Sequence, residues 1–283
     1  MTFVDTPNKK LMHPHYEHQT AKLDKKNNGF SEKKFHKVRN CSTHKKLLES
    51  FSRIGMCLNG KSSGNIPTGD LDKVCLILMN TYEGEDKDLG VGPINDGYLI
   101  GLKHHRIGFK IFYLYNPRST DFTLFLGYFL QNTQKLLTVF YTGGDSATYG
   151  IHGIDFINGT LHEGVVGNVI TSNCNNKARV IFITDSYNGG SVFDIHSVNF
   201  ENNKKPTNLI SFSVKKEEKS LSKEVKRSQG IFTYYFCKII GECPNVTPDQ
   251  LIESINPSIL RFNEFLSYDT TNPELGIVPI FSE

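Results

Sequence analysis

Residues 136–145 read LLTVFYTGGD, an apolar run of strand length that ends in two glycines and an acid. Residues 180–186 have a similar layout and read VIFITDS. Continuous apolar runs of this length are typical of strands that a parallel sheet buries on both faces. In open α/β sheets, ligands bind beyond the carboxyl ends of such strands. The two strand exits, 142–145 and 185–190, are therefore the first candidates for a functional site.

Strand-like and helix-like segments alternate on both sides of these two runs. Strands are predicted at 73–79, 108–114, 136–141, 180–184 and 208–214, and helices at 45–56, 95–104, 121–133 and 230–240. This alternation predicts an α/β domain of three layers, with a mainly parallel central sheet and helices on both faces.

The charge divides the chain into two parts. Residues 1–62 are rich in Lys, His and Asn and contain 13 Lys+Arg against 5 Asp+Glu, a balance of +8, whereas residues 63–283 have a balance of −5. We interpret 1–62 as a basic extension and 63–283 as the folded domain. A basic extension can meet a polyanion or an acidic face of its own body. Because it lacks interleaved aromatics and a recognition-helix pattern, nucleic acid is an unfavoured partner, and polyanion binding stays an alternative function.

The composition narrows the class of protein. With 38% hydrophobic and 22% charged residues among 283, the chain has the composition of an ordinary globular protein. No run approaches about 18 apolar residues, so no membrane span is predicted. The six cysteines are scattered and none has CxxC spacing, which argues against a disulfide framework and against zinc. The first residues lack the layout of a secretory signal, so we expect a cytoplasmic protein.

At the two strand exits the sequence resembles the caspase-like cysteine peptidases, and within them the metacaspases. In that family one strand ends in Tyr-Ser-Gly-His-Gly, which supplies the catalytic His, and the next ends in Asp-Ser-Cys-His-Ser-Gly, which supplies the nucleophile. The matching segments here read FYTGGD at 140–145 and TDSYNGGS at 184–191. Three further family motifs follow the same chain order: GPIND at 92–96, FTYY at 232–235 and NPEL at 272–275. The resemblance covers roughly 70–281 and implies a caspase-like three-layer sandwich.

Both catalytic positions of the family are changed. Gly144 stands at the His position and Tyr187 at the Cys position. Peptidase chemistry needs a thiolate and an imidazole, and a phenol with a pKa near ~10 is a poor nucleophile at neutral pH. The resemblance therefore implies a pseudopeptidase, a non-catalytic binding or regulatory protein. The alternative is a divergent endopeptidase with Arg/Lys specificity and a non-standard nucleophile, for which the candidate residues are His152, Cys174, Ser186 and His196.

The family's specificity pocket is better preserved. In metacaspases a pocket for Arg or Lys is formed by positions that correspond here to Asp96, Thr142 and Asp185. Two neighbouring carboxylates repel each other unless a cation neutralises them, and a guanidinium can bond them bidentately. The resemblance thus implies a basic peptide or protein partner, which includes a metacaspase relative. The structural alternative is that both Asp side chains cap turns or helices.

Several metacaspases also bind calcium through an acidic cluster. Asp194 and Asp155 correspond to two of its ligands, but the family's paired Asp reads LHE at 161–163. Calcium takes six to eight oxygen ligands. We therefore expect no cofactor, with at most a vestigial calcium site.

Overall fold

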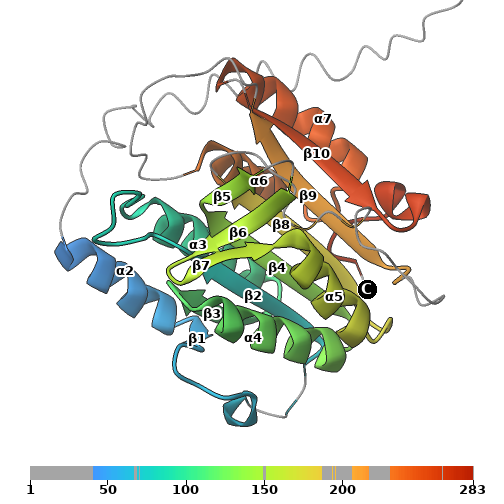
Figure 1. Cartoon of the computed structure of the whole chain (residues 1–283). Helices are drawn as coiled ribbons and strands as arrows, with labels where there is room; N and C mark the ends of the chain where they lie inside the picture. Colours follow the sequence, from blue (N-terminus) through green and yellow to red (C-terminus); the bar gives the residue numbers. More distant parts are fainter. Residues whose placement is uncertain are drawn as a thin grey trace, which may run out of the picture. The chain divides into compact units, whose positions relative to one another are not determined.

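A seven-stranded sheet in the order β1-β3-β2-β4-β8-β9-β10 forms the centre of the fold (Figure 1). All neighbours pair in parallel except β10, which runs antiparallel to β9. The prediction of a mainly parallel α/β sandwich is confirmed. The strands are β1 Gly55–Cys57, β2 Lys73–Met79, β3 Lys110–Tyr115, β4 Leu136–Gly143, β8 Arg179–Ser186, β9 Leu209–Lys216 and β10 Glu264–Thr270.

This computed structural model describes residues 41–66, 69, 71–148, 151–186, 193, 195, 206–216, 230–262 and 264–282. All of them belong to one compact unit, Val38–Glu283. Most of the predicted basic extension lies outside the described residues. Within the described ranges, no helix is both long enough and apolar enough to cross a membrane.

Helices cover both faces of the sheet and create two apolar cores. Alternate residues of β2 enter different cores: Ile77 packs with α3, α6 and α7, whereas Leu76 packs with α4 and α5. This two-sided burial is the reason that the strand reads as a continuous apolar run. The helices are α2 Cys41–Ser52, α3 Gly92–Arg106, α4 Ser119–Asn132, α5 Glu163–Asn173, α6 Ile231–Glu242 and α7 Pro248–Ile259, with 3-10 turns η2 Ser63–Asn65, η3 Leu260–Phe262 and η4 Pro273–Ile277.

The segment around α2 corrects two sequence predictions. The helix predicted at 45–56 ends at Ser52, and residues 55–57 form strand β1 beside β3. Gly55 allows this close approach, because a Cβ atom there would lie 2.8 Å from a methyl carbon of Ile111. The ring of Phe51 is fully buried and stacks on Tyr113 at a centroid distance of 4.2 Å. Residues 41–62, which the sequence analysis assigned to the extension, therefore belong to the folded unit.

A small antiparallel sheet, which the sequence analysis did not predict, follows β4 directly. It consists of β5 Asp145–Thr148, β6 Ile151–Phe156 and β7 Gly159–His162. The backbone amide of Asp155 donates to the carbonyl of Gly144 at 3.1 Å, and the side-chain amide of Asn80 donates to the carbonyl of Asp155 at 2.6 Å. These bonds hold the small sheet at the carboxyl ends of β2 and β4.

Arg179, at the opposite end of the central sheet, fixes the last described residues of the chain. Its Nη1 donates to the carbonyl of Pro279 at 2.8 Å and lies 3.3 Å from the hydroxyl of Ser282. Ile280, between these partners, is fully buried. The C-terminal segment is thus tied to the first residue of β8.

Candidate functional site

Two of the predicted pocket residues are next to last in neighbouring parallel strands. Thr142 of β4 pairs in register with Asp185 of β8. Side chains alternate along a strand, so both residues project to the same face as Phe140 and Ile183, which belong to the core under α3 and α6. The sheet register therefore places the Thr142 hydroxyl and the Asp185 carboxylate side by side, on the face that α3 and α6 cover.

The third residue, Asp96, comes from the second turn of α3. Its side chain is only 3% exposed. Both of its oxygens accept from the backbone N–H of Gly230, at 2.8 Å for Oδ1 and 3.0 Å for Oδ2. The Thr142 hydroxyl bonds the same carboxylate. Asp96 is therefore linked to the end of β4 and to the residue before α6.

Asp185 binds the same helix one turn further on. Its Oδ2 accepts from the hydroxyl of Thr233 at 2.6 Å and from the Thr233 amide at 3.3 Å. Gly230 lies between the two carboxylates. A Cβ atom on Gly230 would be 2.2 Å from Oδ2 of Asp185 and 3.0 Å from Oδ2 of Asp96. The structure thus brings Asp96, Thr142 and Asp185 together around the N-terminus of α6, and we call Asp96 and Asp185 the acidic pair.

Burial and mutual repulsion set the protonation of the acidic pair. The pKa of Asp96 is raised well above its ordinary value, first by burial and second by the charge of Asp185. The Gly230 amide and the Thr142 hydroxyl oppose this rise because they stabilise the carboxylate. The partial positive charge of a helix N-terminus acts in the same direction. A full positive charge at this position would stabilise the ionised pair further.

The Cys237 thiol lies one turn beyond Thr233 on α6, near the acidic pair. Its pKa is raised above the ordinary value, mainly by burial; Lys103 opposes the rise, and the charges of Asp96 and Asp185 add to it. The pKa of Cys75, under the same face of the sheet, is also raised by burial. A thiolate is the nucleophilic form of cysteine. Neither thiol is therefore activated for attack on a carbonyl.

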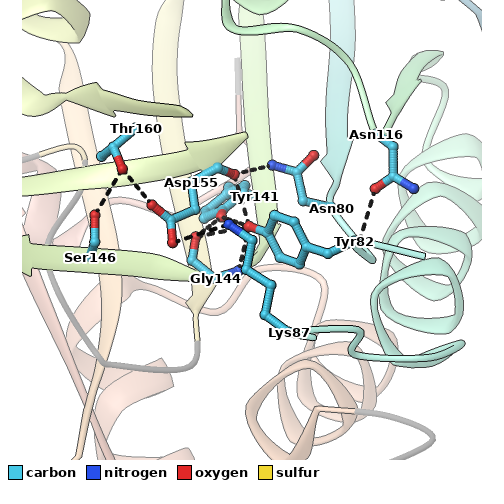
Figure 2. A network of polar contacts seen from close by, with 9 residues as sticks. All are labelled: Asn80, Tyr82, Lys87, Asn116, Tyr141, Gly144, Ser146, Asp155 and Thr160. Atoms are coloured by element: carbon cyan, nitrogen blue, oxygen red, sulfur yellow. Dashed lines mark hydrogen bonds and ion pairs between the residues drawn. The ribbon is translucent and has the colours of Figure 1, made fainter. Parts of the chain in front are cut away.

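Two tyrosine hydroxyls surround Gly144, the residue that the sequence resemblance aligns with a catalytic His (Figure 2). The Gly144 N–H donates to the hydroxyl oxygen of Tyr82 at 2.9 Å, and the Tyr141 hydroxyl donates to the Gly144 carbonyl. The Tyr82 hydroxyl donates to the carbonyl of Asp155 at 2.8 Å. Both tyrosine side chains are fully buried. A Cβ atom on Gly144 would already lie 3.2 Å from the Tyr82 hydroxyl oxygen, so this space is filled.

Tyr82 adopts an unusual backbone conformation to reach this position. Its φ is +54°, in the left-handed region that costs a residue with a Cβ atom roughly 1–2 kcal/mol. Asn116 supports the bend, because its side-chain oxygen accepts from the Thr81 amide at 2.7 Å. Lys87 covers the outer side, with Nζ 4.3 Å from the centre of the Tyr82 ring. The chain tolerates the strain because the loop around it is well bonded.

Of the two residues proposed for calcium, Asp155 is among the described residues and has other partners there. Oδ1 of Asp155 accepts from the Thr160 hydroxyl at 2.7 Å, and its Oδ2 lies 3.8 Å from the Lys87 ammonium (Figure 2). A divalent cation would have to displace that ammonium. No group of three or more His, Cys, Asp or Glu side chains that could hold a metal ion occurs among the described residues. Asp194 lies outside them.

The described candidates for a rebuilt catalytic dyad, Cys174, Ser186 and His152, lie on different parts of the fold. Cys174 follows α5 and precedes β8, whereas Gly144 lies beyond the carboxyl end of β4. Burial raises the pKa of the Cys174 thiol. Ser186 is buried and projects to the face opposite Asp185, and its hydroxyl has no hydrogen-bond partner among the described residues. His152 lies on β6 of the small sheet. Tyr187 and His196 lie outside the described residues.

Structural comparison places this architecture among known folds. The initiator caspase Dronc of Drosophila matches with a TM-score of 0.55 and 13% identity, over 77% of this chain and 91% of that one. The fold is caspase-like. The protein GSU0716 of Geobacter sulfurreducens matches with a TM-score of 0.52 and 12% identity, over 74% of this chain and 99% of that one. No protein-family model and no curated protein matches the sequence.

Within this caspase-like fold, sequence reasoning missed three residues of the site. Gly230 and Thr233 supply the donors to the acidic pair, and Tyr82 fills the space beside Gly144. The FTYY motif at 232–235 contains Thr233 and could have indicated it. Tyr82 gave no signal, because it stands in a polar loop between an apolar strand and a helix.

Proposed function

We propose that this chain is a metacaspase-like pseudopeptidase, a non-catalytic binding or regulatory protein that receives an Arg or Lys side chain at the acidic pair. The partner is a basic peptide or protein, which includes an active metacaspase relative. The observation that carries the proposal is the convergence of the Asp96 and Asp185 carboxylates on one residue, Gly230. Three segments far apart in the sequence meet there, and two of them contribute carboxylates.

A basic side chain suits this position for electrostatic reasons. Burial and then the neighbouring charge of Asp185 raise the pKa of Asp96, so bringing the two carboxylates together in this place costs free energy. The amide and hydroxyl donors of α6 offset part of that cost. A guanidinium brings a full charge and five N–H donors and can bond carboxylates bidentately. We infer that Arg is preferred over Lys.

The non-catalytic part of the proposal rests on the position of Gly144. Glycine offers no group that could move a proton, and Tyr82 and Tyr141 fill the space around it. The buried thiols of Cys75 and Cys237 have raised pKa values, which gives no support to a substitute nucleophile. The divergent-peptidase alternative therefore has no favourable observation among the described residues.

Calorimetric titration with matched peptides tests the binding proposal. We expect a capped pentapeptide with a central Arg to bind at least tenfold more tightly than its Ala counterpart, because charge-assisted hydrogen bonds contribute roughly 1.5–3 kcal/mol each. Asp185→Asn, which keeps the size of the side chain, should abolish the difference. Asp121→Asn removes the same charge from α4 on the opposite face and should preserve it. Measurable and equal affinities for the Arg and Ala peptides in the wild-type protein would refute the proposal.

A further inference from the structure

The N-terminus of α6 has no cap of its own. Its N-cap residue is Gly230, which has no side chain to accept from the first amides of the helix. The N–H of Gly230 donates to Asp96, and the N–H of Thr233 donates to Asp185. The amides that begin a helix need partners from outside it. The acidic pair supplies them from α3 and β8.

The same contacts occupy the acidic pair. Both oxygens of Asp96 accept from the Gly230 amide, and Oδ2 of Asp185 accepts twice from Thr233. The Gly230 backbone fills the space between the carboxylates so closely that a methyl group would overlap Oδ2 of Asp185. A ligand cannot place a charged nitrogen at the centre of the pair while Gly230 stays there.

We propose that the first turn of α6 is an intramolecular occupant of the acidic pair, and that a basic side chain must displace it to bind; this inference rests on the proposed function. The helix end is a suitable placeholder because it presents N–H donors and about half a positive charge. Hydrogen bonds from a charged donor are roughly twice as strong as those from a neutral one. A guanidinium can therefore replace the helix end, and the helix end closes the pair again when the ligand leaves.

Two variants and one control test this autoinhibitory contact with the central-Arg pentapeptide as probe. Thr233→Val keeps the shape of the side chain but removes the hydroxyl that bonds Asp185. Gly230→Ala places a methyl group between the carboxylates. Gly241→Ala is the matched control: it lies at the other end of α6, where a Cβ atom would meet only the flexible end of Lys103, 2.4 Å away.

We expect Thr233→Val to bind the Arg peptide about fivefold more tightly than wild type, which corresponds to one neutral hydrogen bond of about 1 kcal/mol. Gly230→Ala should also bind more tightly, and Gly241→Ala should bind as wild type does. Peptide binding should accelerate amide hydrogen exchange at residues 230 and 233 in the wild-type protein, because those amides lose their acceptors. The exchange measurement needs no substitution, so it decides the question even where a variant fails to fold.

The possible failures are distinguishable. If the Arg peptide binds wild type and Thr233→Val equally and exchange at 230 and 233 is unchanged, the ligand binds without moving α6, and the contact is not inhibitory although the proposed function stands. If wild type fails to bind but Thr233→Val binds, the contact closes the site fully. If neither protein binds the Arg peptide, the proposed function fails, and the autoinhibitory contact fails with it.

Discussion

The side chains around Gly144 fill the space beside it and bond its backbone. Tyr82 accepts from its amide, and Tyr141 donates to its carbonyl. The phenol of Tyr82 is protonated at neutral pH and donates to the carbonyl of Asp155, and burial raises its pKa further, to about 12. Gly144, the two tyrosines and Asp155 form a connected set of bonds in which each hydroxyl has a partner. Introducing a side chain at 144 must disturb that set.

We therefore expect Gly144→His to destabilise the protein by about 1–3 kcal/mol, the usual cost of overfilling a packed site. The cost should be smaller in a Tyr82→Ala background, because the added ring then has space. Urea unfolding of the four proteins of this double-mutant cycle measures the difference. Additive free energies of unfolding would show that Tyr82 does not fill the place of the imidazole. Neither wild type nor Gly144→His should cleave peptides after Arg or Lys.

For single residues, the sequence predicted where the site residues lie better than it predicted the groups that bond them. The juxtaposition of Thr142 and Asp185 follows from the rule that parallel strands end at one edge of the sheet, and the resemblance added Asp96. The donors Gly230 and Thr233 lie 45 or more residues beyond Asp185, and no local pattern connects them to it. Tyr82 was unpredictable because its position depends on a left-handed backbone conformation, which is expected of Gly or Asn and not of Tyr.

The helices α6 and α7 begin in different ways. The N-cap of α7 is Thr247, whose hydroxyl accepts from the Gln250 amide at 3.3 Å while the Gln250 side chain accepts from the Thr247 amide at 3.1 Å. Pro248 occupies the first position of the helix, where no amide hydrogen is needed. This capping box makes the start of α7 self-sufficient, whereas α6 depends on α3 and β8.

Thr247→Ala should therefore destabilise the protein by about 1 kcal/mol, the typical cost of losing a helix N-cap. The peptide affinity should stay at the wild-type value, because the α7 cap has no contact with the acidic pair. Thermal unfolding and peptide titration of the same preparation measure both quantities. Thr247→Ser, which restores the hydroxyl, is the control. A variant that unfolds like wild type would mean that the capping box adds nothing to stability.

Elements with a strong apolar pattern were predictable, and elements without one were not. β2, β4 and β8 are buried on both sides, so their sequences are continuous apolar runs. β5 and β7 read DSAT and GTLH, with too little apolar surface to indicate strands. α7 contains Pro257, which reads as a helix breaker, and the glycines of α5 weaken its helical pattern. Burial in the two cores beside the large sheet stabilises α5 and α7, and that contribution does not appear in their local sequence.

One buried imidazole should contribute strongly to the pH dependence of the stability of the whole domain. His104, near the end of α3, is fully buried against the rings of Phe109 and Phe281, each at a centroid distance of 5.0 Å. Its Nδ1 bonds the carbonyl of Ile100 at 2.9 Å, and its Nε2 has no hydrogen-bond partner in the structure. Burial lowers the pKa of His104 from 6.5 to about 4, so the folded protein holds the neutral form.

Because the unfolded chain binds this proton more readily, stability should fall as the pH drops from 6.5 to 4. The pKa difference corresponds to a loss of about 3 kcal/mol by pH 4. His104→Leu, which cannot ionise, should lose less stability over the same range. The variant is the necessary reference because the raised pKa of Asp96 acts with the opposite sign. Parallel stability curves for the two proteins would contradict the assignment.

The bond network of Arg179 has a practical consequence for attaching the protein to a surface. Arg179 and Asp185 occupy the same strand, six residues apart, which separates them by about 20 Å at roughly 3.3 Å per residue. Since Arg179 holds Ser282 at the amino end of β8, a tag or tether that continues the chain leaves the body at that end. A sensor chip that captures the protein by such a tether would leave the opposite end of the strand facing the solution.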